Sequence, residues 1–276
     1  MKKIVYVISI TLLSISCNDD DVAPANETND ALVTRISENG VTSLELFFDI
    51  ERRLSRYNYY FQGTYSAYAL YEYSEDGLKE LRRYHANDHT LTFRSVFTLD
   101  NVGRVIKADN TSFSDVGGGP SISEFEYNNS GHLMAQELRI PGDPVYQLVE
   151  NTYDSDGNLI KQETTYFPNQ EEEYTGEVTE YTPGSQAIPD SWEKYVFILG
   201  LSGFDEKIRD MFISSVYSQS WNENGSVSYE SNYETSDRVH DENGNLTGQV
   251  ITRKNLLKPQ NPDVVTNMTY DYQKEN

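Results

Sequence analysis

Cysteine, histidine and positive charge are all scarce in this sequence. Its 276 residues include one cysteine, four histidines and 22 Lys and Arg against 44 Asp and Glu, giving a formal net charge of −22. A single cysteine excludes an internal disulfide. The acidic balance disfavours nucleic acid and anionic lipid as partners, because both require clustered Lys and Arg. Uncharged glycans, cations and basic proteins are compatible with it.

Signatures of catalysis and metal binding are also missing. No G-x-S-x-G nucleophile motif occurs, and the glycine run at 117–119 lacks the strand-to-helix context of a phosphate loop. His85, Asp88 and His89 form a conceivable metal trio, but a metal site needs fixed geometry and supporting residues that the pattern does not show. The sequence therefore predicts no catalytic residue, no metal site and no cofactor, and a protein that is not an enzyme.

Only the N-terminus carries a long apolar segment. Lys2 and Lys3 precede the stretch Ile4–Ile15, which is too short to span a bilayer as a stable helix. A positive start followed by such a segment is typical of a secretory signal peptide. We therefore predict a signal peptide over residues 1–16.

Cys17, the single cysteine, stands where this segment ends. Leu13–Cys17 resembles a bacterial lipobox, in which the cysteine is lipidated and becomes the mature N-terminus. The alternative is an ordinary cleaved signal with an incidental cysteine, although an unpaired cysteine is a liability in a secreted chain. We predict a lipidated Cys17 and a disordered acidic tether over residues 17–31. The lipid would hold an outer-membrane lipoprotein, on the periplasmic or the cell-surface face.

A short turn motif recurs through the rest of the chain. It reads Asp, Asn or Ser, two residues, Gly, any residue, then Leu or Val, with the Leu one place earlier in the first copy. The glycines are Gly77, Gly103, Gly131, Gly157, Gly225 and Gly244, and Arg52 and Gly184 occupy the glycine place in two degenerate copies. From Arg52 to Gly184 the spacings are 25, 26, 28, 26 and 27 residues. A fixed period of this kind indicates a repeat architecture.

The motif has the chemistry of a hairpin turn. A type I turn favours Asp, Asn or Ser first and Gly fourth, where the chain enters the left-handed region. The flanks alternate as strands do, with Phe125 and Tyr127 on one face and Glu124 and Glu126 on the other. We predict one all-β domain over residues 32–276, a repetitive antiparallel β-hairpin meander of about seven hairpins, rolled or barrel-like. Short glycine turns would lie at one end of the sheet and longer loops at the other.

Calcium binding is the alternative reading of the YDSDGNL stretch at 153–159. An EF-hand loop places oxygen ligands at positions one, three, five and twelve around a glycine at six. Around Gly157 the first position is Thr152, which is unsuitable. Turn chemistry accounts for every copy of the motif, so we interpret these glycines as structural.

A longer interval separates Gly184 from Gly225. Phe204, Ile208 and Phe212 fall at helical spacing within it. We predict one short helix near 204–214 that plugs or caps the rolled sheet. A lid over a ligand is the alternative, since an aromatic residue such as Trp192 could mark a binding surface.

Tyrosine is unusually abundant, with 21 Tyr against 11 Phe and two Trp. On a two-sided sheet Tyr packs its ring and keeps its hydroxyl in water, which is its ordinary use. The sharper hypothesis is a sugar-binding face on the tyrosine-rich hairpin 57–73. The residues that this hypothesis assigns to ligand binding are Tyr57, Tyr59, Tyr65 and Trp192.

The repeats, the lipobox and the inserted helix together resemble a family of Bacteroidota-type lipoproteins with a porin-like antiparallel β-meander domain. The turns are also similar to the tyrosine–aspartate (YD) repeats of Rhs-type shell proteins. The resemblance covers about residues 32–275 and implies no established activity and no catalytic residue. Strands such as KQETTYF and EVTEYT are too polar for the outward apolar band of about 25 Å that an outer-membrane barrel needs.

The functional prediction is a lipid-anchored envelope lipoprotein that binds or organises a partner, through glycan or nutrient capture or through an envelope protein. A glycan-active hydrolase is the first alternative, which a deep acidic pocket among the long loops would favour. A structural or adhesion module is the second, which a flat surface without pockets would favour.

Overall fold

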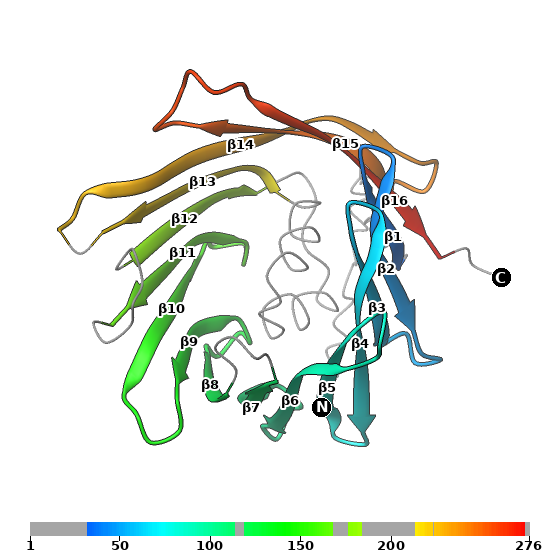
Figure 1. The fold of residues 1–276 in the computed structure, drawn as a ribbon, viewed down its shortest axis with the longest axis vertical. Coiled ribbons are helices and arrows are strands. Elements are labelled where there is room, and N and C mark those ends of the chain that lie inside the picture. Colours follow the sequence, from blue (N-terminus) through cyan, green and yellow to red (C-terminus); the bar gives the residue numbers. More distant parts are fainter. Residues whose placement is uncertain (1–31, 114–118, 168–175, 184–212, 223, 274–276) are drawn as a thin grey trace, which may run out of the picture.

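The protein is a closed antiparallel β-barrel of sixteen strands (Figure 1). The computed structural model describes residues 32–113, 119–167, 176–183, 213–222 and 224–273. Each strand pairs with the next along the chain, and β1 closes the barrel by pairing with β16. The strands are β1 (Val33–Glu38), β2 (Val41–Phe48), β3 (Leu54–Phe61), β4 (Thr64–Ser74), β5 (Gly77–His85), β6 (Leu91–Leu99), β7 (Val105–Ser112), β8 (Pro120–Tyr127), β9 (Leu133–Arg139), β10 (Val145–Tyr153), β11 (Leu159–Tyr166), β12 (Gly176–Pro183), β13 (Ile213–Trp221), β14 (Val227–His240), β15 (Leu246–Asn255) and β16 (Val264–Tyr272).

The all-β meander is confirmed, with eight hairpins instead of about seven. The described residues contain no helix. Residues 213 and 214 of the predicted helix belong to β13, so that boundary was wrong, and the remainder of 204–214 lies outside the described residues. The predicted leader, Cys17, the tether and Trp192 also lie outside them. No helix in the described ranges is long and apolar enough to cross a membrane.

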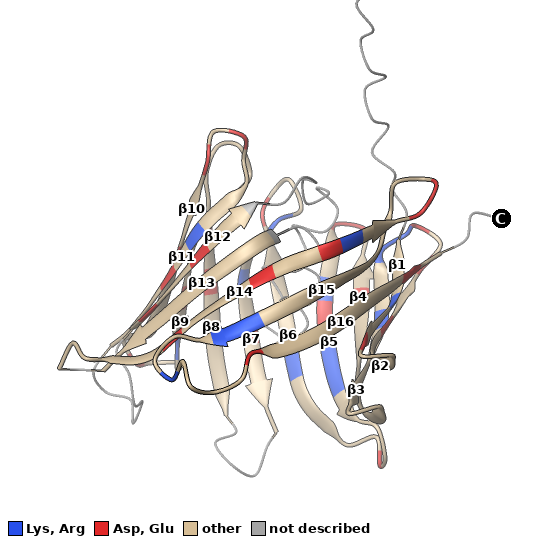
Figure 2. Cartoon of the chain, turned by 90° about the horizontal axis from the view of Figure 1, so that it is seen from above, with Lys and Arg blue, Asp and Glu red and all other residues tan. Residues whose placement is uncertain are grey.

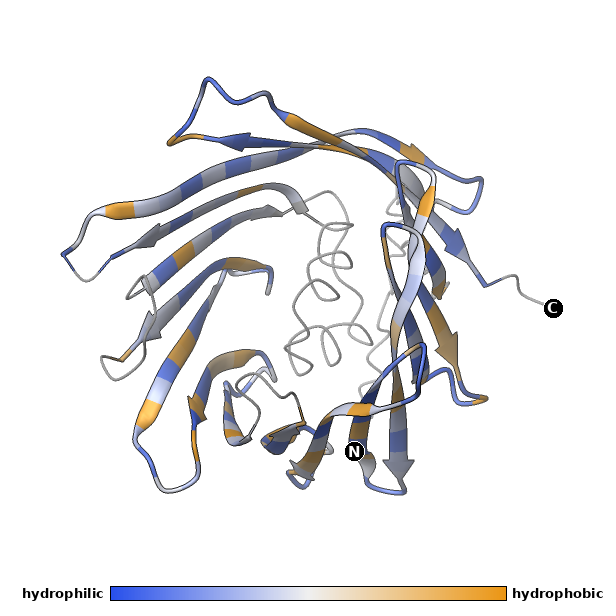
Figure 3. Cartoon of the chain, in the orientation of Figure 1, coloured by the Kyte–Doolittle hydropathy of each residue, from blue (hydrophilic) through white to orange (hydrophobic). Residues whose placement is uncertain are grey.

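The barrel wall has one buried face. Residues that pair directly across two strands share a face, so Tyr71 and its partner Leu81 lie together, as do Ala69 and Arg83. Tyr71, Leu81 and Ala69 are 7%, 1% and 0% exposed. Neighbouring strands cannot cover the convex face of a closed barrel, so the face that holds the almost fully buried apolar side chains of Leu81 and Ala69 is the concave, inner face. Figure 3 shows the resulting alternation of apolar and polar bands along the strands.

The inner face changes in character around the barrel. On β1 to β5 and β16 it is apolar, with Ile36 and Leu44 fully buried. Farther round, polar side chains bond one another across the strands. The hydroxyl of Ser95 donates to Asn110 Oδ1 over 2.7 Å, and Asn110 Nδ2 donates to Ser123 Oγ over 3.1 Å.

The outer face is charged, and Figure 2 shows acidic and basic positions spread along the strands. Glu80 accepts hydrogen bonds from Arg82 Nε and Arg94 Nε, each over 2.7 Å. Arg139 Nη2 lies 2.7 Å from Glu124 Oε1. These groups pair along and across the strands, so the outer wall is polar at mid-height.

The two ends of the barrel differ, and we name them by their turns. The corner end carries the turns 49–52, 74–77, 100–103, 128–131, 154–157 and 241–244, which connect an even-numbered strand to the next odd-numbered one. The loop end carries the turns that follow odd-numbered strands.

Two parts of the predicted division between the ends were wrong. Gly225 follows β13 and lies at the loop end, opposite the other motif glycines. That placement explains the short interval of 19 residues to Gly244, since only β14 separates these two turns. Two loop-end turns, at Asn39–Gly40 and Gln62–Gly63, are also short.

Candidate functional site

Five of the six corners share one hairpin-turn geometry, and the corner 74–77 differs, with Gly77 at φ of +128°. At the corner 154–157, Gly157 N donates to Asp154 O over 3.2 Å, and Gly157 has φ of +85°. Asp154 Oδ1 accepts from the backbone N–H groups of Asp156 and Asn158, over 2.9 and 2.8 Å. Arg52, in the glycine place of the first corner, has φ of +63°. The degenerate copy therefore folds as the others do.

The corner carboxylates are satisfied by N–H donors, which makes them unsuitable as calcium ligands. Asp154 Oδ2 also accepts from the side-chain amide of Asn158 over 3.0 Å. This bond, followed by backbone hydrogen bonds, lowers the pKa of Asp154 despite partial desolvation. The side-chain amide of Asn245 lowers the pKa of Asp241 in the same way. In the part of the chain that the structure describes, no group of three or more His, Cys, Asp or Glu could hold a metal ion.

The histidine cluster of the β5–β6 turn is divided between other partners. Asp88 Oδ1 accepts from Thr90 N over 3.0 Å. His89 Nδ1 lies 3.1 Å from the hydroxyl of Tyr68. Asp88 of the conceivable metal trio is thus bonded within the turn, and His89 is bonded to Tyr68 on the neighbouring strand β4.

A tyrosine before each of several corners ties neighbouring hairpins together. Tyr127 donates its hydroxyl to Val105 O over 2.9 Å, and the guanidinium of Arg104 lies 4.9 Å above its ring. Burial raises the pKa of Tyr127 to about 12. The equivalent hydroxyl bonds join Tyr73 to Leu54, Tyr153 to Leu133 and Tyr272 to Leu246. We call these four bonds the tyrosine ties.

Sequence reasoning recognised the aromatic residue before the turn but missed its bond to the preceding hairpin. One sequence pattern could have predicted this bond. In each tie the tyrosine follows its acceptor, a Leu or Val just after a corner, by 19 to 26 residues. The tyrosines at the corner end therefore have a structural role, because their hydroxyls join neighbouring hairpins.

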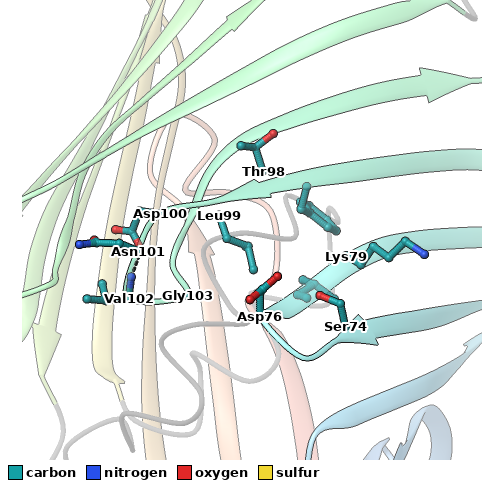
Figure 4. Close-up of a pocket in the computed structure, with 11 residues that line it drawn as sticks. Ser74, Asp76, Lys79, Thr98, Leu99, Asp100, Asn101, Val102 and Gly103 are labelled. Atoms are coloured by element: carbon teal, nitrogen blue, oxygen red, sulfur yellow. Dashed lines mark hydrogen bonds between the residues drawn. The ribbon is translucent and has the colours of Figure 1, made fainter.

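A cavity of about 660 Å³ lies between the corners 74–77 and 100–103. Figure 4 shows Ser74, Asp76 and Lys79 on one side of it and the stretch 98–103 on the other. Its polar groups are largely engaged, since Asp100 bonds Val102 N and Arg104, and Lys79 pairs with Glu72 over 2.8 Å. A Cβ on Gly77 would come within 3.0 Å of Leu99 Cδ1. We read this cavity as the packing gap between two corners.

The predicted ligand-binding tyrosines do not share one face. Tyr57 lies on the inner face at 4% exposure, and burial raises its pKa to about 12. Tyr59 packs half-buried against the same core. Tyr65 lies on the outer face, where its ring contacts that of Tyr60, 5.4 Å away between centroids. Tyr57 and Tyr59 on β3 thus face the interior, whereas Tyr65 on β4 faces outward, and their role in ligand binding stays a prediction.

The outer face of β3, β4 and β5 instead carries a row of four tyrosine rings, Tyr60, Tyr65, Tyr68 and Tyr84, which we call the tyrosine row. Tyr65 and Tyr68 lie 6.4 Å apart between centroids, and Tyr68 and Tyr84 stack at 5.0 Å and 15°. All four rings are half-buried. Because Tyr68 and Tyr84 are direct cross-strand partners, their place side by side is fixed by the backbone register.

Charged and amide groups frame the tyrosine row. The guanidinium of Arg56 lies 4.7 Å over the ring of Tyr68, and its Nη2 donates to the hydroxyl of Tyr65 over 2.8 Å. Tyr60 donates its hydroxyl to Glu45 Oε2 over 2.6 Å. That bond, with further bonds from Asn58 and Arg35, lowers the pKa of Glu45 against the opposing effect of burial.

The arrangement combines flat apolar rings with fixed donors and acceptors at their edges. Neutral sugars need both, because their C–H faces pack on aromatic rings while their hydroxyls require hydrogen-bond partners. Sequence reasoning noted the crowding of tyrosines on 57–73 but missed Tyr84, which joins the row only through the pairing of β4 with β5.

The fold defines a class of closed, porin-like antiparallel barrels. A porin-like protein from Bacteroides uniformis matches with a TM-score of 0.57 at 12% identity, over 87% of this chain and 96% of its own. A second, from Bacteroides vulgatus, matches at 0.50 and 12%, over 87% and 98%. No protein-family model matches the sequence, and a search of curated proteins found no match. This chain is thus similar in fold to those proteins, while its predicted membership of a lipoprotein family and the YD-repeat likeness stay predictions.

Proposed function

We propose that this protein is a barrel of the bacterial outer envelope, held by a lipid on Cys17, that binds an uncharged glycan on the tyrosine row. The lipobox-like stretch Leu13–Cys17 supports the anchor. The likeness to two porin-like proteins of Bacteroides supports the envelope location. The main observation in favour of glycan binding is the tyrosine row, with its frame of Arg56, Asn58 and Glu45.

The outer wall supports an anchored barrel over one that crosses the bilayer. Arg82, Arg94 and Glu80 form a charged group on the middle of β5 and β6. Placing an Arg or Lys at the bilayer midplane on the lipid face costs about 2–4 kcal/mol each. The wall of the mature barrel would therefore face water.

Charge supports a neutral ligand. Removal of the leader with Lys2 and Lys3 changes the net charge from −22 to −24. Such a field opposes the approach of anionic polysaccharides. Neutral sugars carry no such penalty and would reach the rings unhindered.

Glycan binding is tested by affinity electrophoresis of the chain from residue 18 onward. The gels contain starch, xylan, mannan or mixed-linkage glucan. We expect retardation by at least one polysaccharide, and loss of that retardation in Tyr68→Ala. Tyr217→Ala is the matched control, since Tyr217 is a half-buried outer-face tyrosine on β13 whose hydroxyl donates to Glu230 over 2.7 Å. Equal retardation of both variants, or none for the wild type on any polysaccharide, would contradict the proposal.

The anchor has a separate test. Cys17→Ala in the full chain removes the thiol that a lipid would modify. We expect labelled fatty acid to be incorporated into the wild type and not into the variant. Equal labelling of both forms, or labelling of neither, would contradict lipidation at this position.

A cavity among the described residues of the loop end favours binding over hydrolysis. A cavity of about 410 Å³ there is lined by the turns at 39–40 and 62–63 and by Tyr59 and Tyr60, with Glu38 as its one carboxylate. Glycoside hydrolysis typically uses two carboxylates that flank the bond. This cavity therefore does not provide the acidic pocket that the hydrolase alternative requires.

A further inference from the structure

Exposed apolar side chains are unevenly distributed over the barrel. Of the 17 large apolar residues exposed in the described ranges, 11 lie at the loop end: Val41, Phe61, Phe113, Ile140, Phe167, Val227, Tyr229, Leu256, Leu257, Val264 and Val265. By the same criterion the corner end exposes five, Phe47, Ile50, Val102, Ile106 and Val239, and Leu70 lies in mid-strand. Contiguous exposed apolar surface on a protein marks an interaction site, whereas single scattered residues need no explanation.

These residues form a ring because of the topology. Seven of the eight loop-end turns carry at least one of them, and the exception is the β5–β6 turn with His85 and His89. All eight turns close the same rim of one closed sheet. The exposed side chains therefore lie around a single rim, at the ends of strands whose walls are charged.

We propose that this apolar rim inserts into the interfacial region of a lipid bilayer with uncharged, zwitterionic headgroups, so that the barrel stands on the membrane by its loop end. Apolar side chains gain free energy on entering the boundary between headgroups and acyl chains. The charged wall limits the insertion to the turns. This proposal does not depend on glycan binding.

The charge of the chain favours a bilayer over a second copy of the protein. Two copies meeting rim to rim would bring together two chains that each have a net charge of −24 without the leader, and Asp88, Asp143 and Asp263 are exposed in the loop-end turns. A zwitterionic surface carries no net charge and imposes no such repulsion. Lipids also fill the spaces between separate apolar tips, whereas a protein partner needs a continuous complementary surface.

The N-terminal connection is compatible with this orientation. β1 begins at the corner end with Val33. The 15 residues from Cys17 to residue 31 span up to about 50 Å when extended. The nearby strands β3 and β4, of 8 and 11 residues, are only about 25–37 Å long. A lipid on Cys17 could therefore reach the same membrane that the loop end contacts.

Flotation with phosphatidylcholine vesicles tests the rim. The protein is the chain from residue 18 onward, which lacks the leader and Cys17 but keeps every strand of the closed barrel. The rim variant is Phe61→Ser with Leu256→Ser and Leu257→Ser, which are 60%, 41% and 43% exposed. The control is Ile50→Ser with Val102→Ser, 100% and 67% exposed at the opposite end.

We expect the wild type and the control to float with the vesicles, and the rim variant to partition at least about tenfold more weakly. Vesicles with anionic lipid should bind the wild type less well. Thermal unfolding of all three proteins is the control for folding. Matching unfolding curves would show that weaker binding of the rim variant is not caused by a folding defect.

Three results would overturn the proposal. The wild type could stay unbound at every lipid concentration, or the control could lose as much binding as the rim variant. Sedimentation could also show a dimer without lipid that the rim variant abolishes, which would assign the rim to a second copy of the chain.

Discussion

The corner end and the loop end close the same sixteen strands in different ways. At the corner end, carboxylates, tyrosine hydroxyls and the left-handed positions of the turns are all used inside the protein, as at Asp100 and Tyr127. At the loop end the turns differ in length and expose Phe61, Ile140 and Leu257. The difference indicates that stability is concentrated at one rim, which leaves the other free for contacts outside the molecule.

Removing a corner carboxylate should have the largest effect. Asp100→Ala removes the acceptor of Val102 N and Arg104 N and the partner of the Arg104 guanidinium. We expect a loss of about 2–3 kcal/mol in the free energy of unfolding, because several donors lose their partner at once. Urea denaturation measures it, with Asp143→Ala in a loop-end turn as the control. Similar losses in the two variants would remove the distinction between the ends.

Breaking one tyrosine tie should have the next largest effect. Tyr127→Phe keeps the ring and removes only the hydroxyl that donates to Val105 O. We expect a loss of about 1–2 kcal/mol. Tyr217→Phe removes an outer-face hydroxyl bonded to Glu230 and should change stability less. A neutral Tyr127→Phe would mean that the ring alone joins the hairpins.

Relief of a strained backbone position should raise the free energy of unfolding, by less than the two losses described above. Arg52 occupies the left-handed region at φ +63°, which costs a residue with a side chain about 1 kcal/mol. Arg52→Gly is therefore expected to raise the free energy of unfolding by up to about 1 kcal/mol, measured by the thermal midpoint. Asn39→Gly, at φ +50° in a loop-end turn, makes the corresponding comparison. A destabilised Arg52→Gly would show that the Arg52 side chain supports its corner.

The smallest of these effects should be a difference between the two ends in how strongly acid lowers stability. The pKa of Asp154 is lowered from its ordinary value of 3.8, first by Asn158. Its contribution is then fully present above pH 3.8 and is lost as the pH falls through the lower, folded-state pKa. Asp154→Asn, which copies the natural corner residue Asn128, should flatten the pH dependence of the urea midpoint below about pH 4. An unchanged slope would show that this corner does not contribute to acid unfolding.

The hairpin corners were predictable because their chemistry is local. Asp or Asn first and Gly fourth determine the turn within five residues, and even Arg52 in the glycine place was recognised from its spacing. Which end a turn occupies was not local, so Gly225 was assigned to the wrong end. Its position depends on β13, whose start was hidden by the long interval after Gly184.

The candidate site was only partly predictable because it depends on pairing between hairpins. The tyrosine count identified the right region, but it grouped Tyr57 on β3 with Tyr65 on β4, and the pairing of these two strands places them on opposite faces. Tyr84 joins the tyrosine row through its register with Tyr68. Register is set by the turn between β4 and β5 and by which face the whole sheet buries, and neither can be read from the residues of the row themselves.

Closure through β1 and β16 has a consequence for how such proteins can change in size. Since the first and last strands run antiparallel and adjacent, the wall stays closed only if strands are gained or lost in pairs. One repeat unit of about 26 residues supplies such a pair with its own corner and tyrosine tie. Duplication of a unit would therefore widen the barrel in whole steps while leaving every existing joint intact.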